Sequence, residues 1–200
     1  MPIRTSETEI KHLVIAWLAI AFAFTVLIKR WMPLGSELNV LEIFILSSVT
    51  VGSAFIFHEL LHKFVAQRYG SWSEFRMEPK MLLLAVIFPL LAPFIFAAPG
   101  AVMIFNPYLT REENGKISLA GPMMNVILAF LFFTLFLLVP SGIFGWIGKF
   151  GLVINAWLAV FNLIPVSVLD GRKVLAWDRR VYGVALGMAI SMLVMSMIFT

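Results

Sequence analysis

The residues best suited to chemistry in this sequence are His58-Glu59-Leu60-Leu61-His62. On a helix, side chains four positions apart lie on one face, about 40° from each other, so both imidazoles can bind one metal ion. Zn²⁺ is the expected ion, and the neighbouring Glu59 is placed to act as a base. Two of the three histidines fall in this pattern, which favours a metal site over two unrelated helix-capping histidines. The third, His12, is predicted to be an interfacial residue.

A catalytic zinc site uses three protein ligands and leaves one position for water, so another helix must supply the third ligand. The acidic residues in or near apolar segments are Glu42, Glu59 and Asp170. Glu42 precedes His58 by 16 residues, roughly 24 Å along a helix, and is therefore at the wrong depth. Asp170 follows the apolar stretch 150–169 and is the predicted third ligand. We expect it at the C-terminus of that helix, where it opposes the helix dipole unless a cation holds it.

Two polar motifs accompany these residues. Pro165 is predicted to bend or unwind the helix just before Asp170 and so to aim the carboxylate at the metal. Asn162 either makes a hydrogen bond between helices or holds the substrate or the developing oxyanion. Gly121-Pro122-Met123-Met124-Asn125 allows close backbone approach and supplies one amide, and helix packing is its default interpretation.

The composition indicates that the elements carrying these residues lie in a membrane. Hydrophobic residues make up 61% of the 200 positions and charged residues 13%, against about 25% charged in typical soluble domains; the mean hydropathy is +0.97. The charges form short clusters between long uncharged runs, which excludes a disordered chain, a coiled coil and a basic nucleic-acid-binding domain. The absence of cysteine excludes a disulfide scaffold and a cysteine nucleophile. We expect one membrane-embedded domain over residues 1–200.

A helix needs roughly 20 apolar residues to cross a bilayer, and six stretches approach that length. They are 13–28, 38–62, 81–105, 117–139, 150–169 and 181–200. The first is interpreted as a retained anchor, because its flanks lack the positive bias of a signal peptide. The third contains Pro89, Pro93, Pro99 and Gly100, which break a straight helix. The predicted fold is an all-α polytopic membrane protein of about five to six transmembrane helices, with a re-entrant or broken segment at 81–105.

The distribution of Lys and Arg indicates how segment 81–105 runs, since cytoplasmic loops carry the excess of these residues. If the segment crosses once, the two sides carry 7 and 8 of them; if it returns to the side it entered from, they carry 12 and 3. The second count favours a re-entrant segment, with the N-terminus and the loops 63–80, 106–116 and 170–180 cytoplasmic. Non-helical backbone at membrane depth must be covered by protein or line a cavity, so this segment is expected to line a site.

Three segments in this order, each on an apolar stretch, resemble the site-2 protease family of intramembrane zinc metalloproteases, in its minimal prokaryotic or archaeal form. They are His58 to His62, Ala120-Gly121-Pro122 to Asn125, and Asn162 to Gly171, and the resemblance covers about residues 50–180. It implies a catalytic core within about 38–180 that binds one zinc ion per chain. It matches His58, His62 and Asp170 to the zinc ligands, Glu59 to the catalytic base and Asn162 to a polar residue near the active site. Leu61 and Arg172 stand where many members have glycine, so local packing is expected to differ there.

The resemblance implies a zinc metalloendopeptidase that hydrolyses peptide bonds within or near transmembrane segments of membrane-anchored proteins, in regulated intramembrane proteolysis. Its expected partners are a transmembrane protein substrate and the lipid bilayer, with no nucleic acid. We expect a multi-pass protein of the cell membrane whose active site faces the cytoplasmic side. The alternative is a zinc-binding membrane transporter, which should carry several ionisable sites through the bilayer thickness. A scaffold with a structural zinc would not need Glu59.

Overall fold

The structure is a computed structural model, and it describes residues 4–32, 37–95 and 99–199. Among these residues, five helices are long and apolar enough to cross a membrane. They are α1 (Glu7–Trp31), the continuous helix Val40–Arg68, α6 (Arg111–Leu138), α7 (Gly142–Asn162) and α9 (Arg179–Phe199). The predicted polytopic helical fold with five to six spans is confirmed. A short connection around Pro140 joins α6 to α7.

The second span consists of α3 (Val40–Ser47), a π-helical turn η1 (Ser48–Gly52) and α4 (Ser53–Arg68). It begins with a capping box, in which the Asn39 side chain accepts from the Glu42 amide and the Glu42 carboxylate accepts from the Asn39 amide. Glu42 therefore has a structural role at the start of the span. In the wide turn, the carbonyl of Ser48 accepts a hydrogen bond from the Trp17 indole of α1 at 2.9 Å, which ties the first span to the second.

Segment 81–105 does not cross. The helix α5 (Pro79–Leu91) has 13 residues, about 20 Å at 1.5 Å per residue, which is too short for a hydrocarbon core of about 30 Å. It packs along α1, and the chain then returns as strand β2 (Gly100–Phe105), which pairs antiparallel with β1 (Trp72–Met77). The predicted re-entrant segment is confirmed, whereas the two strands were not predicted. Residues 96–98 lie outside the described residues.

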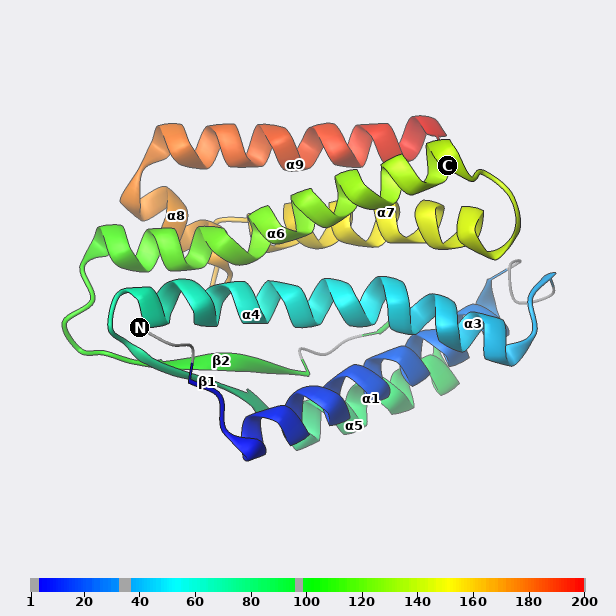
Figure 1. The fold of residues 1–200 in the computed structure, drawn as a ribbon, viewed down its shortest axis with the longest axis horizontal. Helices are drawn as coiled ribbons and strands as arrows, with labels where there is room; N and C mark the ends of the chain where they lie inside the picture. The colour runs from blue at the N-terminus through cyan, green and yellow to red at the C-terminus, as the bar shows by residue number, and fades with distance from the viewer. Residues whose placement is uncertain (1–3, 33–36, 96–98, 200) are drawn as a thin grey trace.

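The segments predicted to share one side of the membrane lie together at one end of the structure (Figure 1). The Arg4 amide donates to the Gln67 side chain at 2.9 Å, and Asn106 donates to the Ser71 hydroxyl at 3.0 Å. At the same end, the short helix α8 (Asp170–Trp177) packs against α6. This arrangement agrees with the Lys and Arg count for a re-entrant segment.

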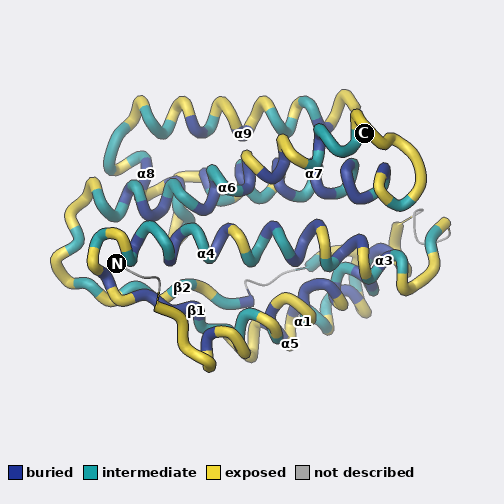
Figure 2. The backbone as a smooth tube through the Cα atoms, viewed as in Figure 1, coloured by how far each residue is buried: buried dark blue, intermediate teal, exposed yellow. Residues whose placement is uncertain are grey.

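The core lies where α6 packs against α4 and α7, with α9 on the outer side (Figure 1). Small residues line these contacts, among them Ala129, Ala156 and Ala159, all fully buried, and they allow the helix backbones to approach closely. Figure 2 shows buried positions concentrated along α4, α6 and α7, while much of α9 is exposed. Exposed apolar residues on the outer helices are expected where lipid is the solvent.

The connection to Asp170 differs from the sequence-based prediction. We expected the helix to bend or unwind at Pro165 and to end at Asp170. The unwinding is confirmed, but it is complete, since α7 ends at Asn162 and residues 163–169 are not helical. Proline disfavours helical backbone in the residue before it and cannot donate to the helix, so Pro165 ends α7 early. Asp170 instead begins α8, where its carboxylate is favourable to the helix dipole. The predicted unfavourable placement at a C-terminus is therefore wrong.

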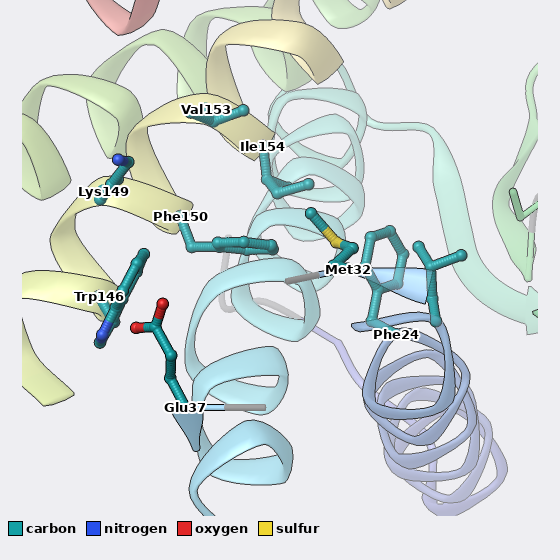
Figure 3. Close-up of a pocket in the computed structure, with 9 residues that line it drawn as sticks. Phe24, Met32, Glu37, Trp146, Lys149, Phe150, Val153 and Ile154 are labelled. Carbon is teal, nitrogen blue, oxygen red and sulfur yellow. The ribbon is translucent and has the colours of Figure 1, made fainter. Parts of the chain in front are cut away.

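A cavity of about 420 Å³ lies between α1 and α7. Figure 3 shows Phe24 and Met32 from the α1 side facing Phe150 of α7, with Glu37 and Lys149 near Trp146. The residues that line it come from the end of α1, from Glu37 ahead of α3, and from the first and middle turns of α7, and none of them carries the chemistry predicted above. The cavity is therefore separate from the histidine pair.

Candidate metal and active site

Three potential metal ligands converge between α4 and α8. His58 and His62 lie one turn apart on α4, and Asp170 is the first residue of α8. The Nε2 atoms of the two histidines are 3.0 Å apart, and Asp170 Oδ2 lies 3.4 Å from His58 Nε2 and 3.1 Å from His62 Nε2. The two histidines are 7% and 8% exposed. The structure thus brings together the three residues that the sequence singled out as ligands.

The hydrogen bonds of the two imidazoles leave their Nε2 atoms free to bind a cation. His62 Nδ1–H donates to the Ile117 carbonyl at 2.7 Å, and His58 Nδ1–H donates to the Asn125 side-chain oxygen at 2.6 Å. In the neutral imidazoles each Nε2 then carries a lone pair directed at the other Nε2 and at the Asp170 carboxylate. Three converging lone pairs repel one another unless a cation lies between them. Two imidazole nitrogens and one carboxylate are a common donor set of catalytic zinc.

Gly121 of α6 keeps the space beside the ligand atoms open. A Cβ at this position would lie 2.3 Å from His62 Nε2 and 2.6 Å from His58 Nε2. Gly121 is therefore required by the close approach of α6 to the histidine pair, which is a more specific role than the predicted helix packing.

The loop after α7 and the start of α8 place Asp170. Gly171 allows α8 to begin against the end of α7, since a Cβ there would lie 2.0 Å from the Leu163 carbonyl oxygen. Burial by itself would raise the pKa of the Asp170 carboxyl, but with no metal bound, imidazoles of His58 and His62 that are protonated at Nε2 donate to this carboxylate and hold that pKa below its ordinary value. Asp170 is therefore ionised at neutral pH, as a metal ligand must be.

Glu59 lies beside the ligands and contacts the re-entrant segment. Its Oε2 accepts a hydrogen bond from the Val102 amide of β2 at 2.9 Å, and its side chain is largely buried. Glu59 is not one of the three clustered ligands, so its carboxylate is available as an acid or base. The contact with β2 places segment 81–105 against the predicted base, as expected for an element that lines a site.

A protein of Methanocaldococcus jannaschii described as a zinc metalloprotease, MJ0611, is 49% identical to this chain over 182 residues, which cover 90% of each chain. The chain belongs to the site-2 protease family. Two more distant zinc metalloproteases are also similar: YwhC of Bacillus subtilis, 28% identical over 64% of this chain and 66% of its own length, and MJ0392 of M. jannaschii, 29% identical over 66% of this chain and 33% of its own. No family model and no solved structure matches. The predicted zinc metalloprotease and its zinc cofactor are confirmed.

In this protease, Asn125 does more than pack helices. Its side-chain nitrogen donates to the Ala54 carbonyl and to the Asn155 side-chain oxygen, both at 3.1 Å, so its own oxygen faces His58. Asn155 in turn donates to the Gly151 carbonyl at 2.9 Å. Both asparagines are fully buried and join α4, α6 and α7. The spacing of Gly121 and Asn125, one helical turn apart like the two histidines, was the available signal for this contact.

Asn162 of the protease is half-buried at the last position of α7, and its amide nitrogen donates to the Leu158 carbonyl at 3.0 Å. That hydrogen bond stays within its own helix. A catalytic role for Asn162 therefore remains a prediction. His12 lies on α1 and is not part of the ligand cluster.

Replacing Asn125 with alanine is expected to weaken zinc binding by about 10- to 100-fold, because His58 loses the acceptor that orients its ring. The measurement is a competition titration of purified protein with a zinc chelator. Asn162→Ala is the matched control, since the Asn162 amide bonds its own helix. Equal zinc affinities of wild type and Asn125→Ala would contradict the orienting role.

Proposed function

We propose that this protease hydrolyses peptide bonds within or near the transmembrane segments of membrane-anchored proteins. In this proposal His58, His62 and Asp170 hold one zinc ion per chain, Glu59 is the base, and residues 1–200 act as a single protease domain. The observation that carries the proposal is the convergence of three ligand atoms, all within 4.8 Å of one another, on helices of a polytopic membrane protein. A buried site of this kind is suited to substrates that enter from the bilayer.

The residues of the site divide the chemistry among them. His58, His62 and Asp170 would hold the zinc, which when bound would supply Lewis acidity and a nucleophilic water at neutral pH. Glu59 accepts the proton of that water and passes it to the leaving amine. Asn162 stabilises the oxyanion if its amide leaves the Leu158 carbonyl. A substrate helix must unwind locally before attack, because its backbone groups are otherwise hydrogen-bonded to one another.

The end that carries the site is proposed to face the cytoplasm, because a re-entrant segment places 12 of the 15 Lys and Arg residues on that side. The chain contains no cysteine, so single cysteines can report the topology. Cysteines replacing Arg68 and Tyr108 are expected to react with a membrane-impermeant thiol reagent from the cytoplasmic side only. A cysteine replacing Ser141, at the opposite end, should react from the other side only. All three positions are exposed. Labelling of Arg68→Cys and Tyr108→Cys from different sides would overturn the arrangement.

Removal of the metal tests the proposed activity. Protease reconstituted in lipid vesicles with a single-span test substrate is expected to cleave it, to lose cleavage when treated with a zinc chelator, and to regain it when Zn²⁺ is added back. Cleavage that persists in a protein shown to be free of metal would refute the proposal. The same vesicles, loaded with a zinc-sensitive dye, should show no zinc uptake above that of empty vesicles. Zinc uptake without cleavage would favour the transporter alternative.

A further inference from the structure

A buried ion pair joins α1 to α4 beside the active site. Glu9 is 0% exposed and Lys63 is 1% exposed, and Lys63 Nζ donates to Glu9 Oε2 and, at 2.8 Å, to Thr5 Oγ1. Buried charges are costly to desolvate, and a buried pair often stabilises a protein no more than apolar side chains would. Neither residue belongs to the ligand cluster. Stability is therefore a weak explanation for this pair.

The second oxygen of Glu9 holds the strand β1. Glu9 Oε1 accepts a hydrogen bond from the Phe75 amide at 3.0 Å. Phe75 is fully buried and contacts Phe55 of α4 edge to face, with ring centroids 5.6 Å apart. The N-cap of α1 makes a second contact with β1, in which the Ser6 hydroxyl donates to the Glu74 carboxylate. One carboxylate, that of Glu9, thus links α1, α4 and β1.

The strand residue that Glu9 binds, Phe75, lies opposite Val102, whose amide binds the proposed base Glu59. Phe75 pairs with Val102 across the two strands. The Phe75 amide points to Glu9 on one edge of the two-stranded sheet. The Val102 amide points to Glu59 on the other edge, at 2.9 Å. In an antiparallel sheet, an opposed pair that exchanges no hydrogen bonds directs both N–H groups outward in this way. A continuous path of contacts therefore runs from the ion pair to Glu59.

We propose that the Glu9–Lys63 pair is a positioning device for the catalytic base, which fixes the strand pair so that the Val102 amide holds the Glu59 carboxylate beside the metal ligands. The inference rests on the proposed role of Glu59. Glutamate has a flexible side chain, and a displacement of about 1 Å in a reacting group can cost about 100-fold in rate. Glu9 and Lys63 are positioning residues, since they touch neither the substrate nor the metal.

The test replaces both charges at once, with Glu9→Leu and Lys63→Leu in one protein. Removing one partner would leave an unpaired buried charge, whereas exchanging the pair for apolar side chains is often neutral for stability. The double variant is expected to keep its zinc content, and its thermal unfolding temperature in detergent should fall by only a few degrees, because the Phe75 amide loses its acceptor. Its kcat should fall by about 10- to 100-fold with KM little changed. A double variant with the kcat of wild type would overturn the proposal.

Val102→Pro tests the path itself. Proline removes the amide that donates to Glu59, and it is tolerated where the N–H of an edge strand faces away from the partner strand. The variant is expected to lose a similar factor in kcat, and adding Val102→Pro to the double variant should cause little further loss, because the changes act through one contact. If the losses in kcat are additive, the proposed path of contacts from the ion pair to Glu59 is refuted. Ile104→Pro is the matched control on the same strand, and an equal loss there would also count against it.

Glu59→Gln, assayed alongside, separates this inference from the proposed function. If Glu59→Gln retains activity, the proposed role of the base is wrong, whatever the other variants show. If Glu59→Gln is inactive and the double Glu9 and Lys63 variant is as active as wild type, the role of Glu59 as the base is supported. Only the positioning role of the ion pair is then refuted.

Discussion

Replacing Glu59 with glutamine is expected to slow cleavage of a transmembrane substrate by about 10²- to 10⁴-fold, the usual contribution of a general base. Glutamine has nearly the same shape as glutamate and can still accept the hydrogen bond from the Val102 amide. It cannot take a proton from water. The three metal ligands are untouched, so the variant should bind as much zinc as wild type.

The measurement pairs steady-state cleavage in lipid vesicles with metal analysis of the same preparation. Glu42→Gln is the matched control, because it makes the same change in the same span at the first turn of α3, where Glu42 caps the helix. Its cleavage rate should be close to that of wild type. A Glu59→Gln protein that contains zinc and cleaves at the wild-type rate would show that another group is the base.

Replacing Gly121 with alanine is expected to lower zinc affinity strongly. Loss of a hydrogen-bond partner of a metal ligand typically lowers metal affinity by about 10- to 100-fold, and the effect of this variant should be larger. The added methyl group would lie 2.3 Å and 2.6 Å from the Nε2 atoms of His62 and His58, on the side of the rings that binds the metal. The rings cannot easily rotate away, because Ile117 and Asn125 hold their Nδ1 atoms. Cleavage should fall together with zinc content.

Gly187→Ala is a suitable control for this variant. Gly187 lies in the apolar helix α9, and a Cβ there would meet no atom within 4 Å. The control should therefore keep both zinc and activity, and it guards against a general effect of alanine on membrane insertion. If Gly121→Ala binds zinc as tightly as wild type, α6 can move away from the histidine pair, and the close approach of Gly121 is not required for the site.

The metal ligands could be predicted from the sequence because two strong constraints act on them. His58 and His62 are spaced by one helical turn, and Asp170 is the acid at the matching membrane depth. The re-entrant segment was predictable because prolines break it and because the Lys and Arg counts depend on its direction. The histidine spacing and the prolines are local patterns, and the Lys and Arg counts are sums over the loops, so none of them requires knowledge of tertiary contacts.

The remaining features depend on contacts that no local pattern reports. The strand Trp72–Met77 mixes three apolar residues with Ser73, Glu74 and Arg76 without a regular alternation, and its partner follows only after α5. Glu9 and Lys63 are 54 positions apart and look like ordinary flanking charges until the fold buries them. The start of α8 at Asp170 was missed because the apolar stretch continues past the point where Pro165 ends α7.

The return of the chain after α5 also determines where the two ends of the described chain lie. The described residues contain five candidate spans, an odd number, so the proposed topology puts Arg4 and Phe199 on opposite faces of the membrane, and Figure 1 shows the two ends of the chain at opposite ends of the bundle. A soluble reporter fused before α1 would share a compartment with the active site, whereas one fused after α9 would have to be translocated. The choice of fusion end therefore decides whether a reporter can obstruct access to the zinc.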